Sequence, residues 1–118
     1  MFGLLCAATS ALCVILFAVF VIAPGAYAQL YGVAADTGGL FLGRRAAPLF
    51  LGLAAFFWAL RGVEAGPLRD ATAWAAALTF IGIAVTGVWA WLDGTASFAI
   101  LVAAGLETAI GFAFLLAR

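Results

Sequence analysis

The sequence contains no histidine and no lysine, and charged residues occupy only 8% of its 118 positions. A soluble domain usually carries about 25% charged residues, so this chain has too few ionic groups to cover a surface exposed to water. Five arginines alone also cannot form the basic surface that contacts a nucleic-acid backbone. These shortages exclude a free soluble enzyme, and we expect no nucleic-acid partner.

Ligands for metals and cofactors are equally scarce. Without histidine and with two cysteines, the chain lacks the usual ligands of zinc, haem and iron–sulfur clusters and the commonest general base. Cys6 and Cys13 share a helix face but lie about 10.5 Å apart along it, too far for a disulfide. We therefore expect no metal, no cofactor and no enzymatic activity, and we expect the two thiols to pack as small buried side chains.

Apolar residues, by contrast, make up 69% of the chain, and the mean hydropathy is +1.29. A helix that crosses the hydrocarbon core needs about 20 apolar residues, and the chain supplies four such runs. The sequence predicts an all-α fold, a transmembrane four-helix up-down bundle, in one domain over residues 1–118. The expected spans are about 2–23, 39–60, 71–90 and 96–117, and the second span starts at either Gly39 or Ala46. The connections are too short to hold an extramembrane domain.

The segment after the first run has two interpretations. Ala26-Tyr27-Ala28 has the small-x-small form that precedes a signal-peptidase site. A signal peptide needs a basic n-region and a short apolar core, whereas this run has no basic residue and about 22 uncharged positions. We expect the first span to be retained as a helix, followed by a loop or short interfacial turn over 27–38.

The arginines favour one orientation in the membrane. Arg61, Arg69 and Arg118 lie on the side of both termini, against Arg44 and Arg45 on the other side. Because cytoplasmic segments carry the excess of basic residues, we expect a bacterial inner-membrane protein with both termini in the cytoplasm. Amphipathic aromatic residues also lie near the expected span ends: Trp58, Trp74, Tyr27, Tyr31, Trp89 and Trp91.

Glu107 stands at the midpoint of the fourth span. A carboxylate at that depth costs roughly 3 kcal/mol and marks a functional site by default. Ala103, Ala104 and Gly111 on its helical face are small, and Ile110 is the one bulky neighbour, so we expect Glu107 to face another helix. It can be a structural carboxyl, protonated or paired inside the bundle, or a proton or cation site, and the structural role is the simpler interpretation.

The pair Arg44-Arg45 completes the candidate intramembrane polar site. If the second span begins near Gly39, both guanidinium groups lie one to two turns inside the membrane, and one of them could pair with Glu107. If the span begins at Ala46, both remain at the headgroups. The two starts have equal support from the sequence.

Small residues occur together in the third span, and they first indicate helix packing and only second a substrate path. They are Thr79, Gly82, Thr86 and Gly87.

Short motifs follow one another in a fixed order from Tyr31 onward. They are Leu30-Tyr31-Gly32-Val33, then Arg45 with Ala47-Pro48-Leu49-Phe50-Leu51-Gly52-Leu53, then Gly82 and Gly87, then Asp93-Gly94, and finally Gly105-Leu106-Glu107. This series resembles a family of small bacterial four-helix integral membrane proteins of unknown function. The resemblance implies location and topology only. An arginine often follows the third-helix glycine in that family, whereas this chain has Val88, so an ion pair built on that arginine is absent.

We expect a non-enzymatic accessory subunit that packs against, stabilises or assembles a larger membrane complex. Its expected partners are membrane lipids and either another integral membrane protein or further copies of itself. The alternative is a small proton-coupled transporter or carrier that uses Glu107, an analogy of topology alone. An enzyme ranks third, because the remaining carboxylates lie near turns and helix caps without a partner base.

Overall fold

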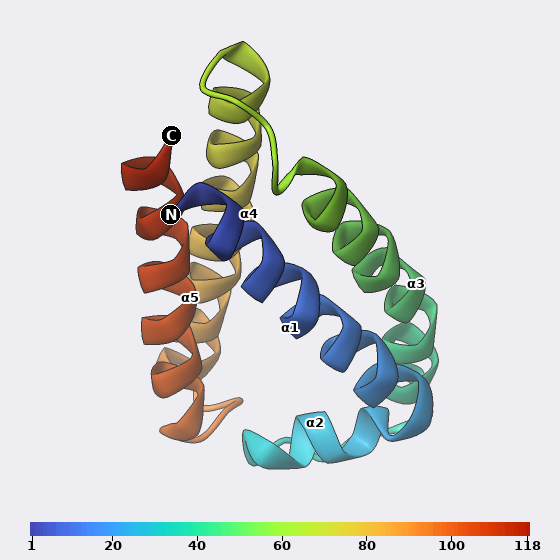
Figure 1. Ribbon diagram of the computed structural model, residues 1–118. Coiled ribbons are helices and arrows are strands. Elements are labelled where there is room, and N and C mark those ends of the chain that lie inside the picture. The colour runs from blue at the N-terminus through green and yellow to red at the C-terminus, as the bar shows by residue number, and fades with distance from the viewer.

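A computed structural model describes all residues, Met1–Arg118, and it is entirely helical (Figure 1). Its helices are α1 (Phe2–Ile22), α2 (Pro24–Leu30), α3 (Thr37–Leu60), α4 (Pro67–Leu92) and α5 (Ala99–Ala117). All except α2 are long and apolar enough to cross a membrane. The predicted all-α fold with four long spans is therefore confirmed, and the protein is a small multi-pass membrane protein.

The four long helices form two antiparallel hairpins, α1 with α3 and α4 with α5. In the first hairpin, the buried Ser10 hydroxyl donates a 2.7 Å hydrogen bond to the Ala54 carbonyl. In the second, a Cβ added to Gly87 would lie 3.7 Å from the Ala104 Cβ, so these helices approach closely through small residues. Small contact residues thus set the spacing within each hairpin.

The two hairpins share one apolar core, which lies at the end of the molecule that holds both chain termini. We call this the terminal end. All four long helices contribute to the core: Phe2, Cys6, Phe57, Ala73, Ala76, Phe80, Phe114 and Ala117. The Phe114 ring is fully buried, with its centroid 6.0 Å from that of Phe2 and 5.5 Å from that of Phe57. As predicted, Cys6 and Cys13 are free thiols in buried positions.

Polar contacts close the terminal end around this core. The Arg69 guanidinium donates to the Ala117 carbonyl, with its Nε 3.2 Å from the oxygen, and lies over the Phe2 ring. It thereby satisfies a carbonyl that the end of α5 leaves without a helical partner. A Cβ on Gly3 would overlap the Arg61 carbonyl oxygen, so α1 approaches the end of α3 at backbone distance.

At the opposite end, which we call the far end, the hairpins diverge and α2 lies across the space between them (Figure 1). The buried residues of α1 extend from Phe2 no further than Cys13. The Ser97 N–H, just before α5, donates a 2.8 Å hydrogen bond to the Tyr31 carbonyl at the end of α2. At the far end, a backbone hydrogen bond therefore links α2 to the segment before α5. At the terminal end, a packed core joins the two hairpins.

Helix α2 was not expected, because residues 27–38 were predicted as a loop or short turn. Pro24 starts it at the first helical position, where the missing N–H costs nothing and the fixed φ favours a helix. Helix α3 begins at Thr37, close to the earlier of the two expected starts, because the Asp36 carboxylate caps it by accepting a 2.7 Å hydrogen bond from the Gly39 N–H.

The last two spans also differ from the expected bounds. Helix α4 begins at Pro67, four residues before the expected position 71, since proline initiates helices and Asp70 suits the first turn. Helix α5 begins at Ala99, three residues after position 96, because the N–H groups of Thr95 and Ala96 bond back to the Ala90 carbonyl.

Candidate functional site

Glu107 lies on α5 at the point where the shared core ends. The face of α5 that carries Glu107 continues through Ile110, Phe114 and Ala117 toward the terminal end. These three residues belong to the core or pack against it. Glu107 is half-buried and lies one turn further toward the far end. Its carboxylate therefore stands at the boundary between the packed half of the molecule and the half in which the hairpins diverge.

The small neighbours of Glu107 serve contact between α5 and α4. A Cβ added to Gly111 would lie 2.9 Å from Ile81 Cγ1 and 3.4 Å from the Ala77 carbonyl oxygen. Ala104 is buried on the same side, against Gly87. The close helix approach expected from these residues thus exists between α5 and α4.

Aromatic rings gather between α1, α2 and α3 at the far end, and we call Phe20, Tyr27, Tyr31 and Phe50 the aromatic cluster. The Tyr27 ring centroid lies 4.7 Å from that of Phe20 and 5.1 Å from that of Tyr31. Phe20 in turn stacks on Phe50 at 5.3 Å. The cluster connects α2 to the α1–α3 hairpin by ring contacts, while the Tyr31 carbonyl connects α2 to the start of α5.

The Tyr27 and Tyr31 side chains are adjacent within the aromatic cluster. Burial raises the pKa of Tyr27 above its usual range, and the adjacent Tyr31 hydroxyl and then the negative charge of Glu107 raise it further. Tyr27 is consequently a neutral hydrogen-bonding group at all physiological pH values. The sequence indicated Tyr27 only as an interfacial ring, although the four-residue spacing of Tyr27 and Tyr31 after Pro24 is a signal for one helical face.

Arg44 and Arg45 lie in the second and third turns of α3, and both are exposed. They line a shallow polar recess with Thr37, Leu40 and Phe41. Neither arginine forms an ion pair or a hydrogen bond with Glu107 in the structure.

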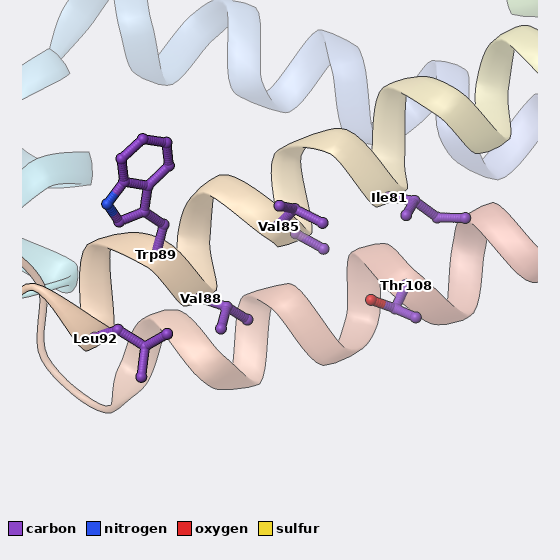
Figure 2. Close-up of a pocket in the computed structure, with 7 residues that line it drawn as sticks. Ile81, Val85, Val88, Trp89, Leu92 and Thr108 are labelled. Atoms are coloured by element: carbon purple, nitrogen blue, oxygen red, sulfur yellow. The ribbon is translucent and has the colours of Figure 1, made fainter.

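Two surfaces of α4 face outward. An open apolar groove runs between α4 and α5, and Figure 2 shows its residues: Ile81, Val85, Val88, Trp89, Leu92 and Thr108, with Ala84. The Thr108 hydroxyl in this groove already donates to the Ala104 carbonyl at 2.7 Å, so the groove offers apolar contact only.

The second surface consists of Ala75, Thr79, Gly82 and Thr86, which we call the small face of α4. All four residues are exposed, and nothing lies within 4 Å of a Cβ built on Gly82. The two threonine hydroxyls donate to carbonyls of their own helix, so the face carries no unsatisfied donor. The four small residues noted in the sequence therefore divide between two faces, because Gly87 packs against Ile100 of α5 instead.

The other carboxylates belong to helix ends and connections. Asp36 caps α3, and Asp93 accepts hydrogen bonds from the Thr95 hydroxyl and the Thr95 N–H, which lower the pKa of its carboxyl. Asp70 is in the first turn of α4, and Glu64 is exposed in the α3–α4 connection. No three His, Cys, Asp or Glu side chains come together in a group that could hold a metal ion.

Comparison of the chain with protein-family models, with curated proteins and with solved structures finds no match. The arguments about function therefore depend on Glu107, the pair Arg44-Arg45 and the small face of α4.

Proposed function

We propose that this protein is a non-enzymatic accessory subunit of the bacterial inner membrane, which packs against a larger membrane complex and stabilises or assembles it. The observation that carries the proposal is the exposed small face of α4. Lipid tails are as apolar as leucine, so membrane helices associate where small residues let their backbones approach. Small residues of this kind lie between α4 and α5 within the hairpin. The small face carries similar residues on the outside of the protein.

The proposed occupant of this face is a transmembrane helix of another integral membrane protein. A helix of that kind fits because Ala75, Thr79, Gly82 and Thr86 follow one another at intervals of three and four residues along a lipid-exposed stripe. The connections between the spans are short, so contact with a partner falls within the bilayer.

The proposed topology has the terminal end in the cytoplasm. Arg61, Arg69 and Arg118 lie at that end, and Arg44 and Arg45 lie near the other. Two of the three cytoplasmic arginines also stack on interfacial tryptophans, Arg61 on Trp58 and Arg118 on Trp74.

Purification in mild detergent without crosslinker tests the accessory role. The wild-type chain is expected to bring down a stoichiometric membrane partner, and Gly82→Leu is expected to lose it. Gly52→Leu is the matched control, because Gly52 is also exposed and nothing lies within 4 Å of its added Cβ. Loss of the partner in both variants, or a wild-type chain that purifies alone, would contradict the proposal. A homodimer that Gly82→Leu dissociates would assign the small face to self-association instead.

A second candidate function is a small proton-coupled carrier, and the half-buried carboxylate of Glu107 within the span α5 favours it. A half-buried carboxylate without an arginine partner can exchange a proton for a cationic substrate. The carrier predicts pH-driven uptake by proteoliposomes that Glu107→Gln abolishes. Uptake that is unchanged in Glu107→Gln would reject it.

A further inference from the structure

We propose that Arg44 and Arg45 form a binding site for the headgroup phosphate of an anionic phospholipid. The site is the recess that these two arginines line with Thr37, Leu40 and Phe41, and we call it the arginine recess. The inference goes beyond the accessory role. It depends neither on the small face of α4 nor on the orientation of the chain in the membrane.

Arg44 and Arg45 differ from the other three arginines of the chain because they have no partner within it. Arg61, Arg69 and Arg118 each lie over an aromatic ring, and the first two also donate to backbone carbonyls. Arg44 and Arg45 are exposed, and their guanidinium groups make no hydrogen bond, ion pair or ring contact within the chain. The two positive charges of the recess are therefore available to a ligand.

The depth of the pair along α3 matches the level of the lipid phosphates. Helix α3 has 24 residues and is about 36 Å long, whereas the hydrocarbon core is about 30 Å thick. About 20 residues counted back from Leu60 reach Phe41, so Arg44 and Arg45 lie about one turn inside the hydrocarbon boundary. Arginine side chains at this depth extend to the headgroups, where anionic lipids attract basic residues.

Two guanidinium groups suit a phosphodiester. Each guanidinium presents planar N–H donors that bind two phosphate oxygens at once. Arg44 and Arg45 are consecutive in the helix, yet both line the one recess, so both charges can act on one ligand. Thr37 lines the same recess and carries a further hydroxyl donor. The adjacent carboxylate, that of Asp36, accepts from the Gly39 N–H and pairs with neither arginine.

The apolar surroundings of the arginines favour a lipid over a free phosphate ion. Leu40 and Phe41 line the recess itself. Toward the terminal end, the same face of α3 continues through Pro48, Leu49 and Phe56, which are all exposed. Helix α3 lies at one edge of the molecule and packs mainly against α1 and α2 (Figure 1). A phospholipid presents its phosphate and its acyl chains in the same order as this face presents arginines and apolar side chains.

Native mass spectrometry of the full chain in mild detergent tests the site by titration with dioleoyl-phosphatidylglycerol and with dioleoyl-phosphatidylcholine. The wild-type chain is expected to bind the anionic lipid at least about tenfold more tightly. The double variant Arg44→Gln/Arg45→Gln should bind the two lipids within about twofold of each other. Arg61→Gln/Arg118→Gln removes the same number of charges at the terminal end and should keep the preference. Equal losses in the two double variants, or a wild-type chain without a preference, would overturn the inference.

A competition arm distinguishes the lipid from a free phosphate ion. Inorganic phosphate at millimolar concentration is expected to displace no more phosphatidylglycerol than chloride does at the same ionic strength. Stronger displacement by inorganic phosphate would assign the recess to the free ion and reject the lipid.

A second measurement uses the wild-type chain and so does not depend on whether the variants fold. A phosphatidylglycerol with a photoactivatable group near its glycerol backbone is crosslinked to the chain in liposomes, and mass spectrometry locates the adducts. The adducts are expected to concentrate over residues 37–49. An even distribution over the four long helices would contradict the site.

The lipid site and the accessory role can fail separately. Gly82→Leu is expected to lose the membrane partner and to keep the preference for phosphatidylglycerol. A membrane partner that Arg44→Gln/Arg45→Gln loses, in a wild-type chain without any lipid preference, would assign the recess to a carboxylate of that partner and overturn the inference.

Discussion

The terminal end and the far end of this protein are held together in different ways. At the terminal end, residues from all four long helices form one core around Phe114, and Arg69 closes it with a hydrogen bond to the Ala117 carbonyl. At the far end, the hairpins diverge, and α2 joins them through ring contacts and the Ser97–Tyr31 backbone hydrogen bond.

The part of the molecule that stabilises the fold differs from the part that carries the candidate functional site. Packing without voids stabilises membrane helices even though lipid is as apolar as the core, so the terminal end provides most of the stability. Glu107 is half-buried and lies where this core stops.

The largest expected effect comes from the centre of the terminal end. Phe114→Ala removes a fully buried ring from contact with Phe2 and Phe57 and should lower the free energy of unfolding by about 2–4 kcal/mol. Phe112→Ala, two residues away, removes a ring that is 54% exposed and should change it by less than about 1 kcal/mol. Unfolding titrations in detergent measure both values, and equal losses would contradict the position of the core.

The next largest effect is expected for the polar contacts of Arg69 at the same end. Arg69→Gln removes the hydrogen bond to the Ala117 carbonyl and the contact with the Phe2 ring, and it should cost about 1–2 kcal/mol. Arg61→Gln is the control, because the exposed guanidinium of Arg61 interacts with Trp58 alone, and it should cost less than about 0.5 kcal/mol. The same titrations measure both values. A larger loss of unfolding free energy in Arg61→Gln than in Arg69→Gln would contradict this role of Arg69.

At the far end, Gly32→Ala should loosen α2 without unfolding the protein. Gly32 has a φ of 72°, and an added Cβ would lie 3.2 Å from the Ser97 Cβ. Gly94→Ala introduces comparable backbone strain at a φ of 81° with nothing within 4 Å, and each strain costs about 1 kcal/mol. Hydrogen exchange over residues 24–33 should accelerate in Gly32→Ala only. Acceleration of the same segment in Gly94→Ala would show that the Ser97 contact is not what holds α2.

The smallest effect is expected for the coupling between Glu107 and Arg45. Since Arg45 is exposed and forms no ion pair with Glu107 in the structure, the stability losses of Glu107→Gln and Arg45→Gln should add, with a coupling energy below about 0.5 kcal/mol. A double-mutant cycle by thermal unfolding in detergent measures this value. A coupling above about 1 kcal/mol would show that an ion pair forms in the membrane.

The sequence predicted the parts of the fold that depend on local composition. Four apolar runs specify four spanning helices, because length and hydropathy alone determine them. The sequence left two starts open for the second span, Gly39 and Ala46, since a capping Asp36 and an internal Pro48 compete as signals, and the helix begins at Thr37, two residues before the earlier one. Helix α2 was missed because seven residues between proline and glycine resemble a turn.

The candidate site was less predictable, because it depends on how the hairpins meet. Glu107 was evident as a carboxylate within a span, and its closely packed neighbours Ala104 and Gly111 followed from helical spacing. The position of the aromatic cluster depends on α2 crossing the far end, where the Ser97 N–H donates to the Tyr31 carbonyl. No periodicity in the sequence carries that information.

Distances between spin labels in proteoliposomes test the contrast between the two ends most directly. One pair joins Gly62 to Leu116 at the terminal end, and the other joins Phe41 to Val102 at the far end, all four positions being exposed. Both pairs are introduced as cysteines on a background in which Cys6 and Cys13 are replaced by alanine. The account predicts a narrow distance distribution for the Gly62–Leu116 pair and a broad one for the Phe41–Val102 pair. Two equally narrow distributions would contradict it.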